Sequence, residues 1–104
     1  MDLRVGDGLR TELRIGDRPA VVAIGEADSF STAVLARALD DALQIGPKPI
    51  TLDVSRVTFM DGSALAVIAT AAATHPGRPL EVRGADAFTT RLFHLVGMEH
   101  LLAA

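Results

Sequence analysis

Residues 50–74 read ITLDVSRVTFMDGSALAVIATAAAT, and two different hydrophobic patterns meet within this stretch. Residues 50–60 are rich in β-branched and apolar side chains, which is typical of a buried strand. The tripeptide Asp-Gly-Ser at 61–63 interrupts this run, and the alanine-rich segment that follows predicts a helix. In open α/β sheets, binding sites concentrate where strands end and helices begin. The turn at 61–63 is therefore either an ordinary helix start or a site of recognition.

Strand-like and helix-like runs alternate on both sides of this turn, in the order β-β-α-β-α-β-α. Strands are expected at 11–15, 20–25, 50–60 and 80–84, and helices at 31–43, 63–75 and within 86–97. The first two strands are expected to form a hairpin, and the nearly all-apolar second strand is typical of one covered on both faces. The sequence therefore predicts an α/β fold with a mixed sheet of four to five strands and helices packed against it.

The first and last helices show the clearest helical periodicity. In the first, the apolar residues lie on one side of the helix. The charged residues lie on the other side: Arg37, Asp40 and Asp41. Three residues are candidates to cap its N-terminus: Asp28, Ser29 and Ser31. In the last, apolar residues recur at i, i+4, i+7 and i+8: Phe88, Leu92, Leu95 and Val96. Gly97 is expected to cap the end of this helix.

Length and composition indicate a single domain over residues 1–104, with residues 1–8 as a ragged segment or an edge strand. The net charge of −3 and the scattered basic residues argue against a nucleic-acid partner. The chain has no cysteine, and its three histidines show no metal-ligand spacing, so no metal or cofactor is expected. The longest apolar stretch, about ten residues, is too short to cross a membrane. We therefore expect a cytoplasmic protein without direct membrane insertion.

The helix that begins near Ser63 is expected to have one buried face and one uncharged outer face. A rotation of 100° per residue places four residues on the buried face: Leu65, Ile68, Ala69 and Ala72. The opposite face holds Ser63, Val67, Thr70 and Thr74, flanked by Ala66 and Ala73. Exposed helix faces usually carry charged residues. An uncharged face therefore indicates either a docking surface or a helix buried all round.

Ser63 itself has three interpretations. As a structural cap, it would accept a backbone N–H bond worth about 1 kcal/mol. As a nucleophile it would need a base and an elbow motif, and neither is recognisable, so the chain is not expected to be an enzyme. An acid pair formed by Asp28 and Asp61 remains a minor catalytic alternative. As a phosphorylation site, Ser63 would gain about −1.5 to −2 charges at a helix N-terminus, which the fold tolerates but a docking surface does not.

The segment 50–68 resembles the signature of STAS domains, the anti-sigma-factor antagonist family, which runs approximately D-[ST]-[ST]-G-L at a strand-to-helix turn. GEAD at 25–28 resembles the family's Gly-Glu-x-Asp stretch, and FTTRLFHLVGMEHLL at 88–102 is similar to its last helix. The pattern places the phosphoacceptor at Ser63. Gly62 replaces the first hydroxyl residue and Ala64 replaces the motif glycine, so a methyl group is expected beside the acceptor.

The resemblance implies a bacterial regulator of transcription that binds an anti-sigma factor with serine-kinase activity. Phosphorylation of Ser63 would then release the partner, and a serine phosphatase would reverse the modification. The alternative is a STAS subunit bound constitutively in a stress-signalling or lipid-transport ATPase complex. Eight residues are expected to contact the partner: Asp28, Asp61, Gly62, Ser63, Ala64, Ala66, Val67 and Thr70.

Overall fold

The computed structural model describes residues 8–45, 49–75, 77 and 79–103. Its elements are β1 (Leu9–Arg14), β2 (Ala20–Ala27), α1 (Thr32–Leu43), β3 (Ile50–Met60), α2 (Gly62–Thr74), β4 (Leu80–Arg83), α3 (Ala87–Leu95) and a short 3-10 helix, η1 (Glu99–Leu101). The predicted order β-β-α-β-α-β-α and the α/β class are confirmed. The expectation for residues 1–7 lies outside the described part of the chain.

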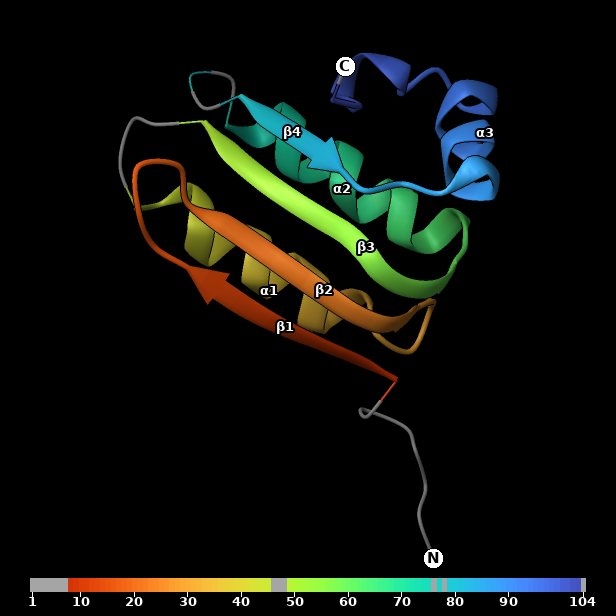
Figure 1. Cartoon of the computed structure of the whole chain (residues 1–104), viewed down its shortest axis with the longest axis horizontal. Helices are drawn as coiled ribbons and strands as arrows, with labels where there is room; N and C mark the ends of the chain where they lie inside the picture. Colours follow the sequence, from red (N-terminus) through yellow and green to blue (C-terminus); the bar gives the residue numbers. More distant parts are fainter. Residues whose placement is uncertain (1–7, 46–48, 76, 78, 104) are drawn as a thin grey trace, which may run out of the picture.

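The sheet has four strands in the order β1-β2-β3-β4. β1 pairs antiparallel with β2, which confirms the predicted hairpin, and β2, β3 and β4 run parallel. The two crossovers place α1 and α2 on the same face of the sheet (Figure 1). Within the described residues, no helix is long and apolar enough to cross a membrane.

The core lies between the sheet and these two helices. Alternate residues of β3 point into it, and α1 and α2 contribute Leu39 and Ile68, which are fully buried. Complete burial of one such side chain contributes about 1.5–3 kcal/mol to stability. β3 therefore runs through the centre of the molecule and ends at Met60, directly before the Asp-Gly-Ser turn.

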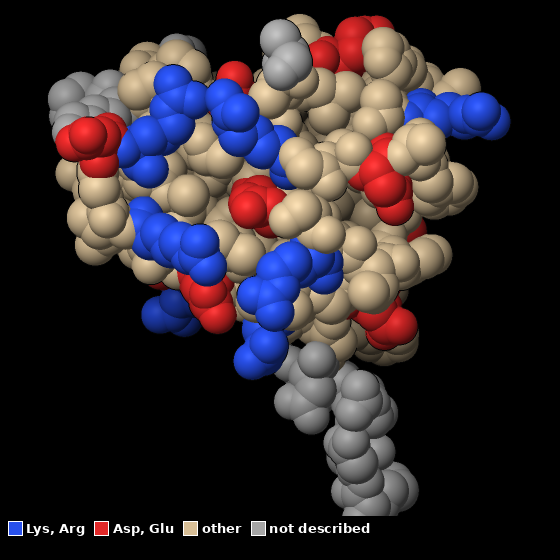
Figure 2. All heavy atoms as spheres, viewed as in Figure 1, with Lys and Arg blue, Asp and Glu red and all other residues tan. Residues whose placement is uncertain are grey.

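The prediction that β2 is covered on both faces is confirmed by the burial of Val21, Val22 and Ala23, although α1 and α2 lie on only one face. The other face carries the charged residues of β1, and Figure 2 shows acidic and basic side chains spread over it. Val22 points to this open face, where its register partners are Glu12 and Asp53, yet it is only 2% exposed. Long charged side chains cover apolar surface with their aliphatic stems. We infer that they provide the cover on this face.

The first strand also begins and ends earlier than predicted. It spans residues 9–14 rather than 11–15, because Leu9 packs into the core while Ile15 lies outside the strand and is exposed.

The last helix forms where it was predicted, but a different face is buried. Thr89 and Phe93 face the core, whereas Phe88, Leu95 and Val96 are exposed and Leu92 is half-buried. Phe93 and Leu92 lie on adjacent stripes of the helix, and only the tertiary contact decides which stripe is buried.

The chain reverses after α3 and returns to the sheet. Gly97 adopts a φ of 76°, a conformation that favours glycine, and Met98 N donates to Phe93 O at 2.8 Å. The predicted glycine cap is therefore confirmed. Beyond η1, Leu102 forms a parallel bridge to Val82, and Ala103 N donates to Val82 O at 2.8 Å. This C-terminal segment therefore pairs with the outer edge of β4 at Val82.

Candidate functional site

Two loops lie side by side at the C-terminal ends of β2 and β3. The strands are parallel neighbours, and Asp61 N donates to Ala27 O at 3.1 Å across them. Gly25, the first residue of the GEAD stretch, has a φ of 111° and packs against the backbone of Gly8, so a side chain at this position would clash. The structure thus brings the two sequence motifs, GEAD and DGS, to one end of the sheet.

Asp61, and not Ser63, caps α2. Its Oδ1 accepts hydrogen bonds from the backbone nitrogens of Ser63, at 3.0 Å, and Ala64, at 3.2 Å. These are two of the N–H groups that the first turn of a helix leaves without a partner. The interpretation of Ser63 as the structural cap is therefore wrong.

The hydroxyl of Ser63 turns back to the same carboxylate. Ser63 Oγ donates to Asp61 Oδ1 at 2.5 Å, and the Ser63 side chain remains half-buried at the surface. This hydrogen bond is the main reason why the pKa of Asp61 lies below its ordinary value, and the amides of Ala64 and Ser63 lower it further. The serine hydroxyl is therefore positioned by an ionised carboxylate rather than by a hydrogen bond to the backbone.

The β2–α1 loop uses its polar residues differently. Ser31 occupies the N-cap position of α1 but makes no side-chain cap bond. Its buried Oγ accepts from Asp28 N at 2.9 Å and donates to Glu26 O at 3.1 Å, while the Asp28 carboxylate accepts from Phe30 N at 3.0 Å. Asp28 therefore bonds within its own loop, whereas Asp61 bonds mainly to the start of α2, and the backbone N–H of Ser29 in the β2–α1 loop also lowers the pKa of Asp61.

Phe30 is a candidate contact residue that the sequence analysis missed. It lies in this loop and is 74% exposed, which is unusual for so large an apolar side chain. Its position between two serines, outside any apolar period, was the available signal.

The outer surface of α2 agrees with the predicted helical geometry. On the predicted inner face, Leu65 and Ile68 are buried and Ala69 and Ala72 half-buried. Residues on the opposite face are exposed or half-exposed, so the helix is not buried all round. We call the outer residues the α2 face: Ser63, Ala66, Val67, Thr70 and Thr74 are exposed or half-exposed and uncharged.

Ala64 does not belong to this face. It is 1% exposed and lies in the core cluster, so its methyl group points inward. The expectation that Ala64 contacts a partner through its side chain, or places a methyl group beside Ser63, is therefore wrong. Gly62, by contrast, is exposed.

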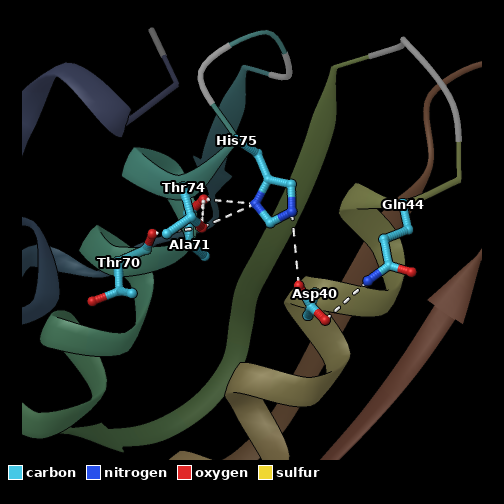
Figure 3. Close-up of polar contacts among 6 residues, drawn as sticks. All are labelled: Asp40, Gln44, Thr70, Ala71, Thr74 and His75. Atoms are coloured by element: carbon cyan, nitrogen blue, oxygen red, sulfur yellow. Dashed lines mark hydrogen bonds and ion pairs between the residues drawn. The ribbon is translucent and has the colours of Figure 1, made fainter.

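A groove of about 650 Å³ separates the α2 face from α1. Its α2 wall includes Val67, Thr70 and Thr74, and its α1 wall is charged: Arg37, Asp40 and Asp41. His75 also lines the groove, and its Nε2 lies 3.7 Å from Asp40 Oδ1 (Figure 3). The sequence could not show this groove, because it forms between segments about thirty residues apart. The uncharged face is therefore bordered by an acidic wall.

The described residues contain no group of three or more potential metal ligands. What the arrangement offers is a positioned hydroxyl, an uncharged helix face and a charged groove wall. These are features of a surface that recognises another macromolecule.

A family model described as "Mlab, STAS domain" matches residues 12–103. No curated protein matches the chain significantly. An anti-sigma factor antagonist from Mycobacterium paratuberculosis has a similar structure, with a TM-score of 0.82 at 21% identity over 92% of this chain and 84% of that one. The phosphorylated form of the Bacillus cell fate determinant SpoIIAA gives 0.65 at 15% identity, over 91% and 88%. A sulfate transporter family protein from Wolinella succinogenes gives 0.57 at 19%, over 78% and 75%. At these identities the structures establish a shared fold, and the family model covers most of the sequence. The chain therefore belongs to the STAS domain family.

Proposed function

We propose that the protein is an anti-sigma-factor antagonist that binds an anti-sigma factor with serine-kinase activity, and that phosphorylation of Ser63 ends this binding. The observation that carries the proposal is the position of Ser63. Its hydroxyl lies at the head of the uncharged α2 face and is held by Asp61 at 2.5 Å. The fold is shared with anti-sigma factor antagonists, one of them determined in a phosphorylated form, and this supports the proposal.

The hydrogen-bond geometry explains how the modification would act. When the γ-phosphoryl group of ATP is transferred to Oγ, the hydroxyl proton is lost and ADP leaves. Asp61 then loses its donor and faces a phosphate that carries about −1.5 to −2 charges. The N-terminus of α2 offsets part of this repulsion, by about 0.3–1 kcal/mol. The fold therefore persists while the surface changes.

Phosphorylation of Ser63 is expected to weaken partner binding more than it weakens the fold. Contact with Ala66, Val67 and Thr70 would exclude water, and a phosphate beside them would have to be desolvated. The acidic wall formed by Asp40 and Asp41 further favours a partner that carries lysine or arginine opposite α1. A serine phosphatase would restore the binding-competent surface.

The test uses the full chain and purified serine kinases of the anti-sigma-factor type encoded in the same genome. With Mg-ATP, mass spectrometry should locate phosphate on Ser63. Ser63→Ala should bind the kinase like the unmodified chain, and Ser63→Asp should bind at least about tenfold more weakly.

Ser55 provides the matched control. Its hydroxyl donates to Asp53 Oδ1 at 2.7 Å in the same Asp-x-Ser arrangement, but it lies within β3. It should carry no phosphate, and Ser55→Asp should leave binding unchanged. If Ser63 remains unmodified and Ser63→Asp binds its partner like the wild type, the switch is refuted. A stoichiometric partner retained under those conditions would instead indicate a constitutive STAS subunit.

A further inference from the structure

Within the described residues, the sheet has one edge that the chain partly covers and one open edge. At β4, the C-terminal segment covers the edge through Leu102 and Ala103. At the opposite side β1 is the last strand, and its only strand partner in the described part of the chain is β2. An open edge strand is a template for pairing with another strand.

The hydrogen-bond parity identifies which residues of β1 face outward. Glu26 N donates to Gly8 O, so Gly8 directs its backbone groups toward β2. Because this direction alternates along an antiparallel strand, the even-numbered residues of β1 bond to β2. Thr11 and Leu13 therefore present their N–H and C=O groups to the open edge.

The side chains at this edge are apolar on one face and of alternating charge on the other. Leu13 is 45% exposed, and Ile15, directly after the strand, is 76% exposed. On the open face of the sheet, Arg14 Nη2 lies 3.5 Å from Glu12 Oε1. Natural edge strands usually avoid exposed apolar residues.

We propose that β1 is a homodimer interface, in which a second copy of this chain adds its own β1 antiparallel across a two-fold axis at Leu13. In this register, Leu13 pairs with Leu13 of the second copy, and Thr11 lies opposite Ile15, the residue directly after the strand. On the open face, Glu12 of each copy lies opposite Arg14 of the other, so both cross-strand pairs join opposite charges. The two sheets then form one continuous eight-stranded sheet.

Two other registers pair the charged residues or cover the exposed apolar residues of β1 less well. A two-fold axis at Glu12 places Glu12 against Glu12 and Arg10 against Arg14, which is repulsive. An axis at Thr11 pairs Arg10 with Glu12, but it sets Leu13 against Leu9, which is already buried, and leaves Ile15 exposed. Only the axis at Leu13 covers both exposed apolar side chains and pairs both charges.

The interface is separate from the surface around Ser63, because β2 lies between β1 and β3. A dimer would therefore display two copies of the α2 face. The inference does not depend on the proposed partner, so either can fail without the other.

Sedimentation velocity of the full chain over a wide concentration range tests the interface. The wild type should shift from monomer to dimer, and Leu13→Lys should remain monomeric. Glu12→Arg and Arg14→Glu should each raise the dissociation constant at least about tenfold, because each replaces two attractive pairs with two repulsive ones. Arg91→Glu on α3 makes the same charge change as Arg14→Glu, but away from β1, and should leave the dimer intact.

Mixing the two charge variants gives the decisive measurement. One variant then carries only arginine, and the other only glutamate, at positions 12 and 14. An equimolar mixture should form a heterodimer with the wild-type dissociation constant, and circular dichroism should show both variants folded. The inference is overturned if the wild type stays monomeric throughout, if the dimer is insensitive to Glu12→Arg, or if the mixture does not associate.

Discussion

The loops after β2 and β3 both combine an aspartate with a nearby serine, yet the two serines are used in opposite ways. In the β2–α1 loop, Ser31 is buried, and its hydroxyl exchanges hydrogen bonds with the backbone of Asp28 and Glu26. In the β3–α2 loop, Asp61 makes the backbone contacts, and Ser63 donates only to that carboxylate.

The difference shows how a fold separates a structural serine from an accessible one. A hydroxyl that satisfies buried backbone groups cannot be modified without loss of those bonds. A hydroxyl that bonds only to one side-chain acceptor can be modified without loss of backbone hydrogen bonds. The carboxylate of Asp61 takes over the capping role, and this leaves the oxygen of Ser63 available at the surface.

The largest expected effect of breaking this contrast is on folding stability. Ser31→Ala removes the acceptor of Asp28 N at a buried position and should lower the free energy of unfolding by about 1–3 kcal/mol. Ser63→Ala is the matched change in the other loop and should lower it by less than about 0.5 kcal/mol. Urea denaturation of both variants measures the difference. Equal losses in the free energy of unfolding would show that the two serines contribute equally to stability.

A second, smaller effect concerns the cap itself. Asp61→Ala should destabilise the protein by about 1 kcal/mol, because two N–H groups of α2 lose their acceptor. Asp61→Asn keeps an acceptor oxygen and should cost only a few tenths of a kcal/mol, since asparagine is an equally good cap. Thermal unfolding at neutral pH compares the two. A large loss in the asparagine variant would point to the charge of Asp61 rather than to its capping bonds.

The smallest effect is on acid titration. The pKa of folded Asp61 lies below its ordinary value of 3.8, so its contribution to stability is complete above that pH and is lost as the pH falls through the folded pKa. Because the Ser63 hydroxyl is the main cause, Ser63→Ala should raise the pKa of Asp61 toward 3.8 and reduce the stability lost on acidification. An NMR titration of the side-chain carboxyl carbons measures it. Asp53, whose pKa is lowered chiefly by Ser55, is the internal reference and should not move.

Periodicity and turn chemistry predict much of this molecule. Alternation of strand and helix runs gave the element order, and the hydrophobic period placed Leu65 and Ile68 in the core. Periodicity could not choose between two apolar stripes of α3, because Phe93 and Leu92 are equally apolar and only packing separates them. It also could not show that charged side chains, rather than helices, cover Val22 on the open face.

The candidate site was predictable where it is local in sequence. Asp61 and Ser63 are neighbours, so their position at a strand-to-helix turn followed directly from the sequence. The division of roles between them depends on side-chain rotamers, which no pattern encodes. The α1 wall of the groove depends on how α1 and α2 pack, and Ala64 is buried because the first turn of α2 already lies against the core.

The bridge between Leu102 and Val82 limits how far the sheet can grow. A sheet with two open edges can polymerise indefinitely, because each added copy exposes a new edge. Here Leu102 and Ala103 occupy the outer edge of β4 at Val82, so the proposed pairing through β1 would use the remaining edge and stop at two copies. A chain that ends before Leu102 would lose this stop, and the pairing that now closes would become a route to open-ended filaments.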